Sequence, residues 1–183
     1  LITELTDEIV SAGSKPDRKP LIVSACPAWV KYCEQFMPEL IPMLSTLKTP
    51  QQISGAIIKS VVPVSEDKPR VYTVSVTPCT AMKFEARRDS MTRKGISDID
   101  TVLTVRELAR LIVLYGIDIT NIDPEPADEP MELRSSASLL AESAGGITES
   151  VLRSLAARMG EKEAEKTAMK KLRNSGSFRE TTI

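Results

Sequence analysis

The chain has 183 residues and a formal net charge of −1, which excludes the strongly basic surface that nucleic acids and anionic membranes require. Hydrophobic residues make up 42% of the sequence, enough for one buried core. The apolar runs are far shorter than the roughly 18–20 residues that cross a bilayer. We therefore expect neither a nucleic-acid partner nor a membrane partner.

The content of histidine and cysteine limits the catalytic and metal-binding sites that the chain can form. Histidine is absent, which removes the commonest general base and the commonest zinc ligand. The three cysteines are an odd number that does not suit a disulfide framework, and no secretory leader opens the sequence. We therefore expect a protein of the reducing cytoplasm. Because the sequence starts at Leu1 without a methionine, we also expect it to be part of a longer polypeptide.

Helices and short strands are predicted to alternate along the chain. The expected elements are, in order, a helix over 1–12, a loop over 13–20, a strand over 21–25, a helix over 29–37, a helix over 50–62, a strand over 71–76, a helical stretch over 83–88, a strand over 99–104, a helix over 105–115, an acidic loop over 118–130, turns and a helix over 135–155 that starts or breaks at Gly145-Gly146, and a polar helix over 160–173 with a frayed tail. Thr49 before Pro50 predicts a capped helix start, and Gly116 predicts a helix end. The order of elements predicts an α/β fold with a parallel sheet covered by helices.

Two of the three cysteines occupy equivalent places. Cys26 and Cys79 each follow a predicted strand and lie beside a proline. The carboxyl ends of parallel strands line the crevice where open α/β sheets bind ligands. Thiolates suit soft metals and iron–sulfur clusters, although buried structural cysteines are an alternative that the residues alone leave open. Cys33 falls inside a predicted helix, where a small buried apolar residue is expected.

Four stretches, in register along the chain, resemble the catalytic domain of the iron-only (FeFe) hydrogenases. They are Ser24–Val30, Pro38–Gly55, Thr77–Ala86 and Asp98–Arg110, with a weaker match over Ser135–Arg153. The resemblance is strongest over residues 1–155. It implies that residues 1–183 are a partial catalytic domain, the N-terminal portion of the large-subunit domain, with one of its two lobes and part of the second.

The resemblance also implies a cofactor, the H-cluster, in which a 4Fe–4S cubane shares one cysteine with a di-iron subcluster. Cys26 and Cys79 align with two of the four cubane ligands. The positions that would line the cofactor are Ala25, Thr49, Pro50, Gln51, Thr77 and Met82. Ser45, Glu8 and Glu85 are candidates for a proton path, although the polar face of a helix explains Glu8 equally well and a cap explains Ser45.

Departures from the family pattern are equally informative. Ala25 stands where the family has a proton-relaying cysteine, and a methyl group carries no proton. Met82 stands where a lysine binds a cyanide of the di-iron subcluster, and Lys83 is one residue out of register. Thr77 replaces a methionine. These changes resemble the divergent, sensory branch of the family and imply low turnover or H2 sensing. A pattern of Gly and Phe residues is likewise replaced by Ser138, Ala141 and Glu142.

No cysteine follows Cys79, so two cubane ligands are missing. We expect them from a C-terminal lobe with two further cysteines, in the same polypeptide or in another chain. A ferredoxin-type electron partner or a sensor module is the other partner that the resemblance implies. This chain alone is therefore expected to lack an intact H-cluster and to be inactive.

Three functions stay open. The first is an oxidoreductase or H2 sensor that interconverts H2 with protons and electrons when complete. The second is a hydrogenase-like iron–sulfur assembly or carrier protein that lacks the di-iron subcluster. The third is a metal-free structural lobe in which the cysteines are simply buried.

Overall fold

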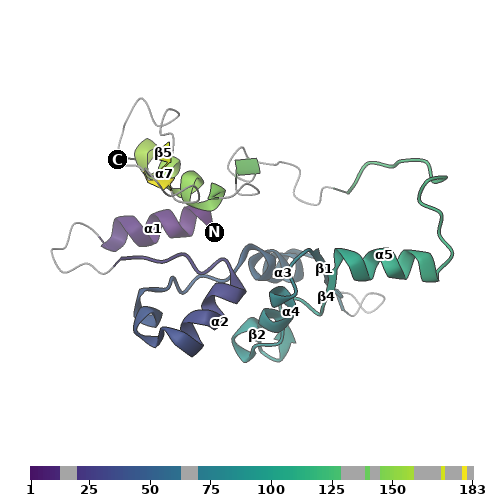
Figure 1. Cartoon of the computed structure of the whole chain (residues 1–183), viewed down its shortest axis with the longest axis horizontal. Helices are drawn as coiled ribbons and strands as arrows, with labels where there is room; N and C mark the ends of the chain where they lie inside the picture. Colours follow the sequence, from purple (N-terminus) through teal and green to yellow (C-terminus); the bar gives the residue numbers. More distant parts are fainter. Residues whose placement is uncertain are drawn as a thin grey trace. The chain divides into compact units, whose positions relative to one another are not determined.

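A computed structural model describes residues 1–12, 20–62, 70–128, 139–140, 145–158, 170–171 and 179–180. The chain divides into two compact units (Figure 1). The first combines the two ends of the chain, Leu1–Val23 and Asp128–Ile183, and the second is Ser24–Ala127. The site residues predicted from the sequence, apart from Glu8, belong to the second unit.

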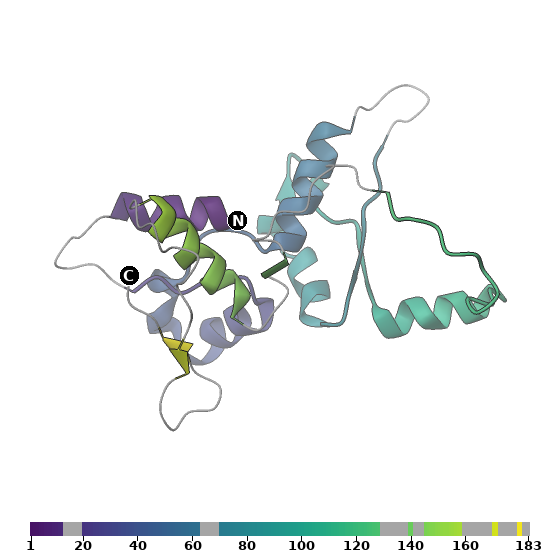
Figure 2. The ribbon, with the colours of Figure 1, turned by 90° about the horizontal axis from the view of Figure 1, so that it is seen from above.

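The first unit is built on two helices, α1 (Ile2–Ala12) and α7 (Gly146–Arg158), which lie side by side (Figures 1 and 2). Leu5 of α1 and Val151 of α7 are buried, and Asp7 forms an ion pair with Arg158. The predicted start of a helix at Gly145-Gly146 is confirmed, because Gly145 has φ +78° and α7 begins at the next residue.

A short antiparallel pair, β5 (Lys170–Lys171) and β6 (Arg179–Glu180), also belongs to this unit. The predicted polar helix over 160–173 is therefore wrong at Lys170–Lys171, and the tail is not frayed at Arg179–Glu180. A helix with so thin an apolar stripe gains little from packing, so backbone pairing prevails there. The remainder of 160–183 lies outside the described residues, as do Ser138, Ala141 and Glu142.

The second unit is organised around two parallel strands, β1 (Val74–Thr77) and β4 (Thr101–Thr104). Val74 lies opposite Thr101 and Thr77 opposite Thr104. The connection between the strands carries a helix, as parallel pairing requires. The predicted α/β class with a parallel sheet and helices is thus confirmed, although both strands begin later than the predicted 71–76 and 99–104.

The helices of the second unit are close to the predicted ones. They are α2 (Pro27–Phe36), a 3-10 helix over Pro38–Met43, α3 (Pro50–Val61), α4 (Ala81–Ala86), a 3-10 turn over Asp89–Met91, and α5 (Val105–Leu114). Thr49 caps α3 as predicted, its side chain accepting from the Gln52 N–H. Thr104 and Glu107 form a capping box at the start of α5, and Gly116 follows its end with φ +67°.

One predicted strand does not form. Residues 21–25 make no strand ladder, and only Ile22 takes part in an isolated bridge. The Ser24 side chain instead fixes this segment against residues 45–47, because its Oγ donates to the carbonyls of Ser45 at 2.8 Å and Leu47 at 3.0 Å. Cys26 therefore follows an extended segment rather than a strand.

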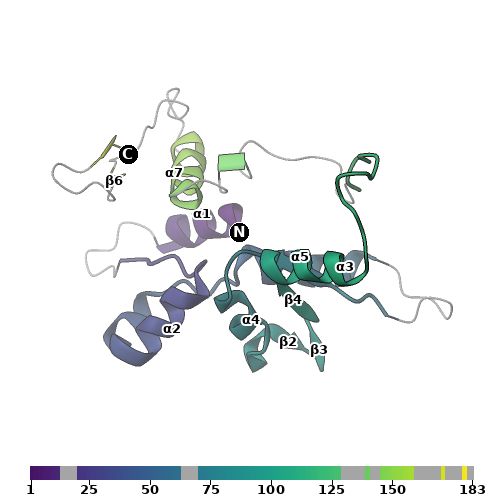
Figure 3. The same ribbon diagram turned by 45° about the vertical axis from the view of Figure 1, so that its right-hand side comes forward.

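A hairpin that the sequence did not predict joins α4 to β4 (Figure 3). Strands β2 (Thr92–Arg93) and β3 (Ile96–Ser97) are antiparallel, and the turn residues Lys94 and Gly95 have φ of 52° and 78°. Positive φ at both central residues is the geometry of tight hairpins. Strands of two residues have no apolar alternation to reveal them.

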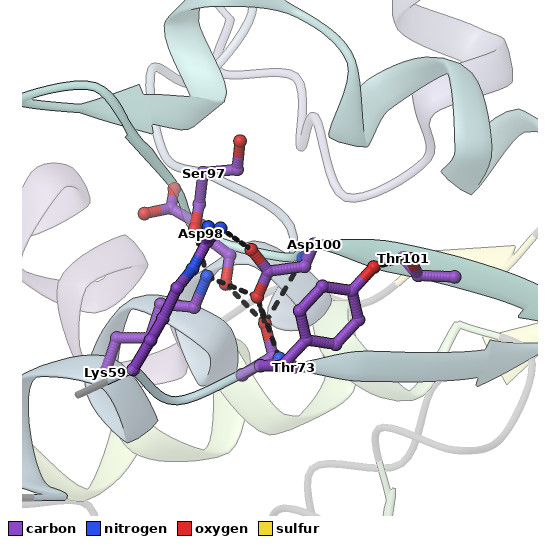
Figure 4. Close-up of polar contacts among 8 residues, drawn as sticks. Lys59, Thr73, Ser97, Asp98, Asp100 and Thr101 are labelled. Carbon is purple, nitrogen blue, oxygen red and sulfur yellow. Dashed lines mark hydrogen bonds and ion pairs between the residues drawn. The ribbon is translucent and has the colours of Figure 1, made fainter. Parts of the chain in front are cut away.

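Asp100 joins α3, the start of β1 and the start of β4 (Figure 4). Its carboxylate binds the Lys59 ammonium at 2.6 Å and the Arg70 guanidinium at 2.7 Å, and it accepts from the Thr73 backbone N–H at 2.8 Å. The Thr73 carbonyl in turn accepts from the N–H groups of Asp100 and Thr101. Burial raises the pKa of Asp100, but the hydrogen bonds from Lys59, Thr73 and Arg70 outweigh it and hold this pKa well below its usual range.

We expect Asp100→Asn to destabilise the fold by about 3 kcal/mol at neutral pH, because it leaves the largely buried Lys59 ammonium without a counter-charge. Since the folded pKa of Asp100 is depressed, its contribution is present above the unfolded pKa of about 3.9 and is lost as the pH falls below that value. Urea unfolding followed by circular dichroism across this acidic range should give a flatter pH dependence for the variant. Asp123→Asn, in the exposed loop, is the control; a variant as stable as this control would contradict the assignment.

Candidate functional site

The two predicted metal ligands lie at the starts of two helices that pack together. Cys26 is the N-cap of α2, in extended conformation before Pro27, and is exposed. Cys79 follows β1 and precedes α4; it is partly buried, and its N–H donates to the Thr77 hydroxyl at 3.3 Å. The two helices α2 and α4 are in contact. Both thiols are free.

Cys33 has a different environment. It is fully buried in α2. Burial raises the pKa of the Cys33 thiol, and the nearby Glu39 and Glu34 carboxylates raise it further. A buried thiol in its protonated form is a poor metal ligand, which fits the expected packing role.

Thr49 and Glu85 are brought together in the interior of the second unit. The Thr49 hydroxyl donates to Glu85 Oε2 at 2.8 Å, and both residues are buried. Burial raises the pKa of the Glu85 carboxyl, opposed by the Thr49 and Gln52 side chains and by the charges of Arg88 and Lys48. The Gln52 side chain is fully buried, yet its Oε1 and Nε2 make no hydrogen bond of normal geometry.

Gln51 links the start of α3 to β1 and α4. Its Oε1 accepts from the Ser75 hydroxyl at 2.7 Å, and its Nε2 donates to the Met82 carbonyl at 3.4 Å. The structure thus places four of the predicted cofactor-lining and proton-path residues around one junction: Thr49, Gln51, Met82 and Glu85. Pro50 lies between Thr49 and Gln51 as the first residue of α3.

Lys83 does not replace the lysine missing at Met82. Its ammonium binds Glu107 of α5, with Nζ 2.6 Å from Oε2. This pair and the Thr104 hydrogen bonds lower the pKa of Glu107 to about 2. Lys83, one residue beyond the family's lysine position, thus pairs with α5 in this structure.

A cavity of about 140 Å³, lined by both polar and apolar side chains, lies beside Glu85. Its lining is Ser24, Pro27, Val30, Ser45, Thr46, Leu47, Lys48, Glu85, Arg88, Ser90 and Met91. Ser45 is therefore in the same cavity as Glu85. Glu8 belongs to α1 in the first unit, and its place on a proton path stays a prediction.

Sequence reasoning missed several polar residues of this site. Lys48 pairs with Asp98, and Arg88 pairs with Glu34 of α2. Ser75 and Gln52 also lie at the junction, and the tandem Gln51-Gln52 after a helix cap was the available signal. Only tertiary packing reveals the others, because Lys48, Ser75 and Arg88 meet partners 24 or more residues away in sequence.

The cysteine thiols are the type of ligand that an iron–sulfur cluster needs, but there are fewer of them than the four that a cubane requires. Two accessible thiols supply soft anionic ligands, as such clusters need. Among the described residues, no group of three or more His, Cys, Asp or Glu side chains could hold a metal ion. Further ligands must come from elsewhere for a cubane to be held.

Solved structures of FeFe hydrogenases are similar to this fold. One, from a study of stepwise H-cluster assembly in HydA(deltaEFG), aligns with TM-score 0.68 and 30% identity, covering 84% of this chain and 39% of that one. Another, an apo form of HydA1 from Chlamydomonas reinhardtii, aligns with TM-score 0.71 and 26% identity, covering 100% of this chain and 46% of that one. The architecture is that of an FeFe hydrogenase domain.

All of residues 1–183 match the family described as iron only hydrogenase large subunit, C-terminal domain. The chain is 37% identical over 183 residues to iron hydrogenase 1 of Clostridium pasteurianum, covering 99% of this chain and 31% of that protein. It is also 33% identical over 138 residues to the cytosolic Fe-S cluster assembly factor nar1 of Aspergillus fumigatus, covering 67% of this chain and 23% of that factor. This chain belongs to the iron-only hydrogenase large-subunit family, and it spans about a third or less of these two relatives.

In the part of the chain that the structure describes, no helix is both long and apolar enough to cross a membrane.

We expect the three thiols to react with iodoacetamide in the order of their exposure. In the metal-free folded chain, Cys26 should be modified first and Cys79 more slowly, whereas Cys33 should react only after unfolding. Mass spectrometry of peptides after timed quenching measures the three rates. Urea-unfolded chain, in which all three should react alike, is the control, and rapid labelling of Cys33 in the folded chain would contradict its burial.

Proposed function

We propose that this chain is part of a protein that interconverts H2 with protons and electrons at an H-cluster. Cys26 and Cys79 would hold two corners of the cubane, and Thr49, Pro50, Gln51 and Met82 would line the di-iron subcluster. The observation that carries the proposal is the match of the whole chain to the hydrogenase family. The hydrogen bonds that join Thr49 to Glu85 and Gln51 to Met82, together with the two free thiols, support it.

The remaining ligands would come from the rest of the domain. The chain spans 31% of the Clostridium pasteurianum protein and 46% of the Chlamydomonas HydA1 chain. The end of α5 supports such a partner lobe, because Val113, Leu114 and Tyr115 are 75–76% exposed. Large apolar side chains gathered on a surface mark a place where another segment packs. We place the complete protein in the cytoplasm, with a ferredoxin-type electron partner or a sensor module.

A low-turnover, H2-sensing role is the finer part of the proposal. Ala25 has no titratable group at the position of the relay cysteine. Met82 has no positive charge to bind a cyanide at the position of the family's lysine. Lys83 is occupied by Glu107, so no lysine of α4 compensates. Slow proton delivery would suit a protein that detects H2 rather than one that consumes it.

A second candidate function is iron–sulfur assembly or transport without a di-iron subcluster. The similarity to the nar1 factor of Aspergillus fumigatus favours it. Ala25 and Met82 are compatible with it, because a protein without a di-iron subcluster needs neither a relay nor a cyanide contact. A metal-free structural lobe is the third outcome.

Infrared spectroscopy of the complete protein, matured with the di-iron subcluster, separates these functions. We expect bands of bound CO and cyanide, since the proposed site holds a di-iron subcluster. Iron analysis of the same sample is the control. Iron without these bands would favour assembly or transport, and a protein without iron would be the structural lobe.

The sensory proposal predicts the effect of Ala25→Cys. Restoring a thiol at the relay position should raise H2 turnover, by about 10²-fold if proton transfer limits the rate. H2 oxidation with an artificial electron acceptor measures it, and Ala25→Ser tests whether a hydroxyl suffices. A wild-type protein as fast as relay-cysteine enzymes would contradict the sensory role; an unchanged rate in the cysteine variant would place the bottleneck elsewhere.

A further inference from the structure

The two proposed cubane ligands occupy equivalent positions at the starts of their helices. The carbonyl of Cys26 accepts the first hydrogen bond of α2, from the Val30 N–H at 3.1 Å. The carbonyl of Cys79 accepts from the Met82 N–H at 3.3 Å, in the turn that leads into α4. Positions along both helices can therefore be counted from the two cysteines.

Side-chain contacts join α2 to α4 at matching positions. Lys31 and Phe84 each lie five residues after the cysteine of their own helix, and the Lys31 ammonium is 4.8 Å from the centre of the Phe84 ring. Further along, Glu34 of α2 forms an ion pair with Arg88, which follows α4. These two residues lie eight and nine residues after their cysteines. Because early positions contact early ones and late positions contact late ones, the two helices run in the same direction and in the same register.

This register places Cys26 and Cys79 at the same end of the helix pair. The two contacts lie about 1.5 turns and about 2.5 turns from the helix starts. Helices joined at two levels cannot slide along each other without breaking a contact. The helix starts, and the thiols that they carry, therefore keep one spacing as long as the contacts hold.

The four contact residues form one connected group. The Arg88 guanidinium pairs with Glu34, and its central carbon is also 5.8 Å from the centre of the Phe84 ring. Phe84 is thus contacted by a cation from each side, Lys31 of α2 and Arg88 after α4. The face of an aromatic ring attracts positive charge. We call Lys31, Glu34, Phe84 and Arg88 the α2–α4 clamp.

Apolar packing contributes little to the spacing of these helices. Of the residues of α4, Glu85 alone is buried, and α2 buries Pro27 and Cys33. A cavity of about 140 Å³ is lined by Pro27 and Val30 of α2 together with Glu85 and Arg88. Interdigitated apolar side chains would fix two helices without polar contacts. Here the cavity takes part of their place, so the spacing depends on the clamp.

We propose that the α2–α4 clamp holds Cys26 and Cys79 at a fixed spacing, so that the two thiols form a preorganised pair before any cluster binds. This inference rests on the proposed role of the two cysteines as cubane ligands, which the hydrogenase and assembly functions share. Ligands that are already in place lose little conformational freedom on binding, so they hold a metal more tightly. The clamp residues act through the cysteines and are therefore positioning residues.

The spacing is measured in the folded, metal-free chain by dipolar EPR between nitroxide labels on Cys26 and Cys79. Cys33 stays unlabelled because it is fully buried. We expect a narrow distance distribution in the wild type. Glu34→Arg and Arg88→Glu should each broaden it, because each places two like charges across the helix pair. The double variant should narrow it again, since the ion pair re-forms with its charges exchanged.

Arg87→Glu is the matched control and should leave the distribution unchanged. Arg87 is the exposed neighbour of Arg88 and forms no ion pair in the described part of the chain. Exposed ion pairs and cation–π contacts are individually weak, so the variants should fold, as circular dichroism checks. If a charge reversal nevertheless unfolds the chain, Phe84→Ala replaces it and should also broaden the distribution. A broad distribution in the wild type, or a narrow one in every clamp variant, would overturn the proposal.

The consequence for a cluster is measured in the complete, cluster-loaded protein as the rate of iron loss to a chelator. Glu34→Arg and Arg88→Glu should each raise this rate by about 10-fold, as expected when groups that orient metal ligands are lost. The double variant should lower the rate again, and Arg87→Glu should match the wild type. Wild-type rates in both single variants would contradict the clamp.

Failure of the proposed function is distinguishable from failure of the clamp. A complete wild-type protein that takes up no iron would remove the role of Cys26 and Cys79 as cubane ligands. The label distances in the metal-free chain would still decide whether the clamp fixes their spacing.

Discussion

The second unit depends on the buried carboxylate of Asp100. This group holds Lys59 of α3 and the Thr73 backbone before β1, and it lies just before β4. It therefore sets how α3 lies against both strands. The other end of α3 carries Thr49, Pro50 and Gln51, so the same constraint brings the helix start to Met82 and Glu85 of α4. Gly55 permits this approach, because a Cβ there would lie 2.3 Å from the Asp98 carbonyl oxygen.

The interior of this unit is unusually polar. Among its described residues, the buried side chains Thr49, Gln52, Thr73, Glu85 and Asp98 accompany a small apolar core of Cys33, Ile99 and Val102. Much of the apolar surface, including the end of α5, is exposed instead. Polar interiors cost stability unless their groups are paired, and here Thr49 pairs with Glu85 and Asp98 with Lys48. Exposed apolar side chains gathered on a surface suit a packing interface, and the chain spans 31% of the Clostridium pasteurianum protein and 46% of the Chlamydomonas HydA1 chain.

Much of this could be predicted from the sequence, and the failures have physical causes. The helices with strong local signals, such as α3 behind its Thr49 cap and α5 before Gly116, were predicted within a few residues. The strand over 21–25 was wrong because an apolar run does not specify a pairing partner, and here a serine side chain holds the segment instead. The β2–β3 hairpin was missed because two-residue strands have no period, and Lys170–Lys171 was misassigned because a thin apolar stripe does not secure a helix.

The sequence by itself determined the family. For the site, it predicted two thiol ligands beside prolines and the altered neighbours Ala25 and Met82. The spacing of motifs identifies the family because cluster ligands must be specific residue types at fixed positions in the sequence. Only the tertiary structure decided that Lys83 pairs with Glu107 and that Cys33 is fully buried in α2. It also decided that Glu85 is buried against Thr49 beside a cavity. These facts depend on burial and on partners far apart in sequence. A carboxyl group's environment, and with it its protonation, exists only once the helices have packed around it.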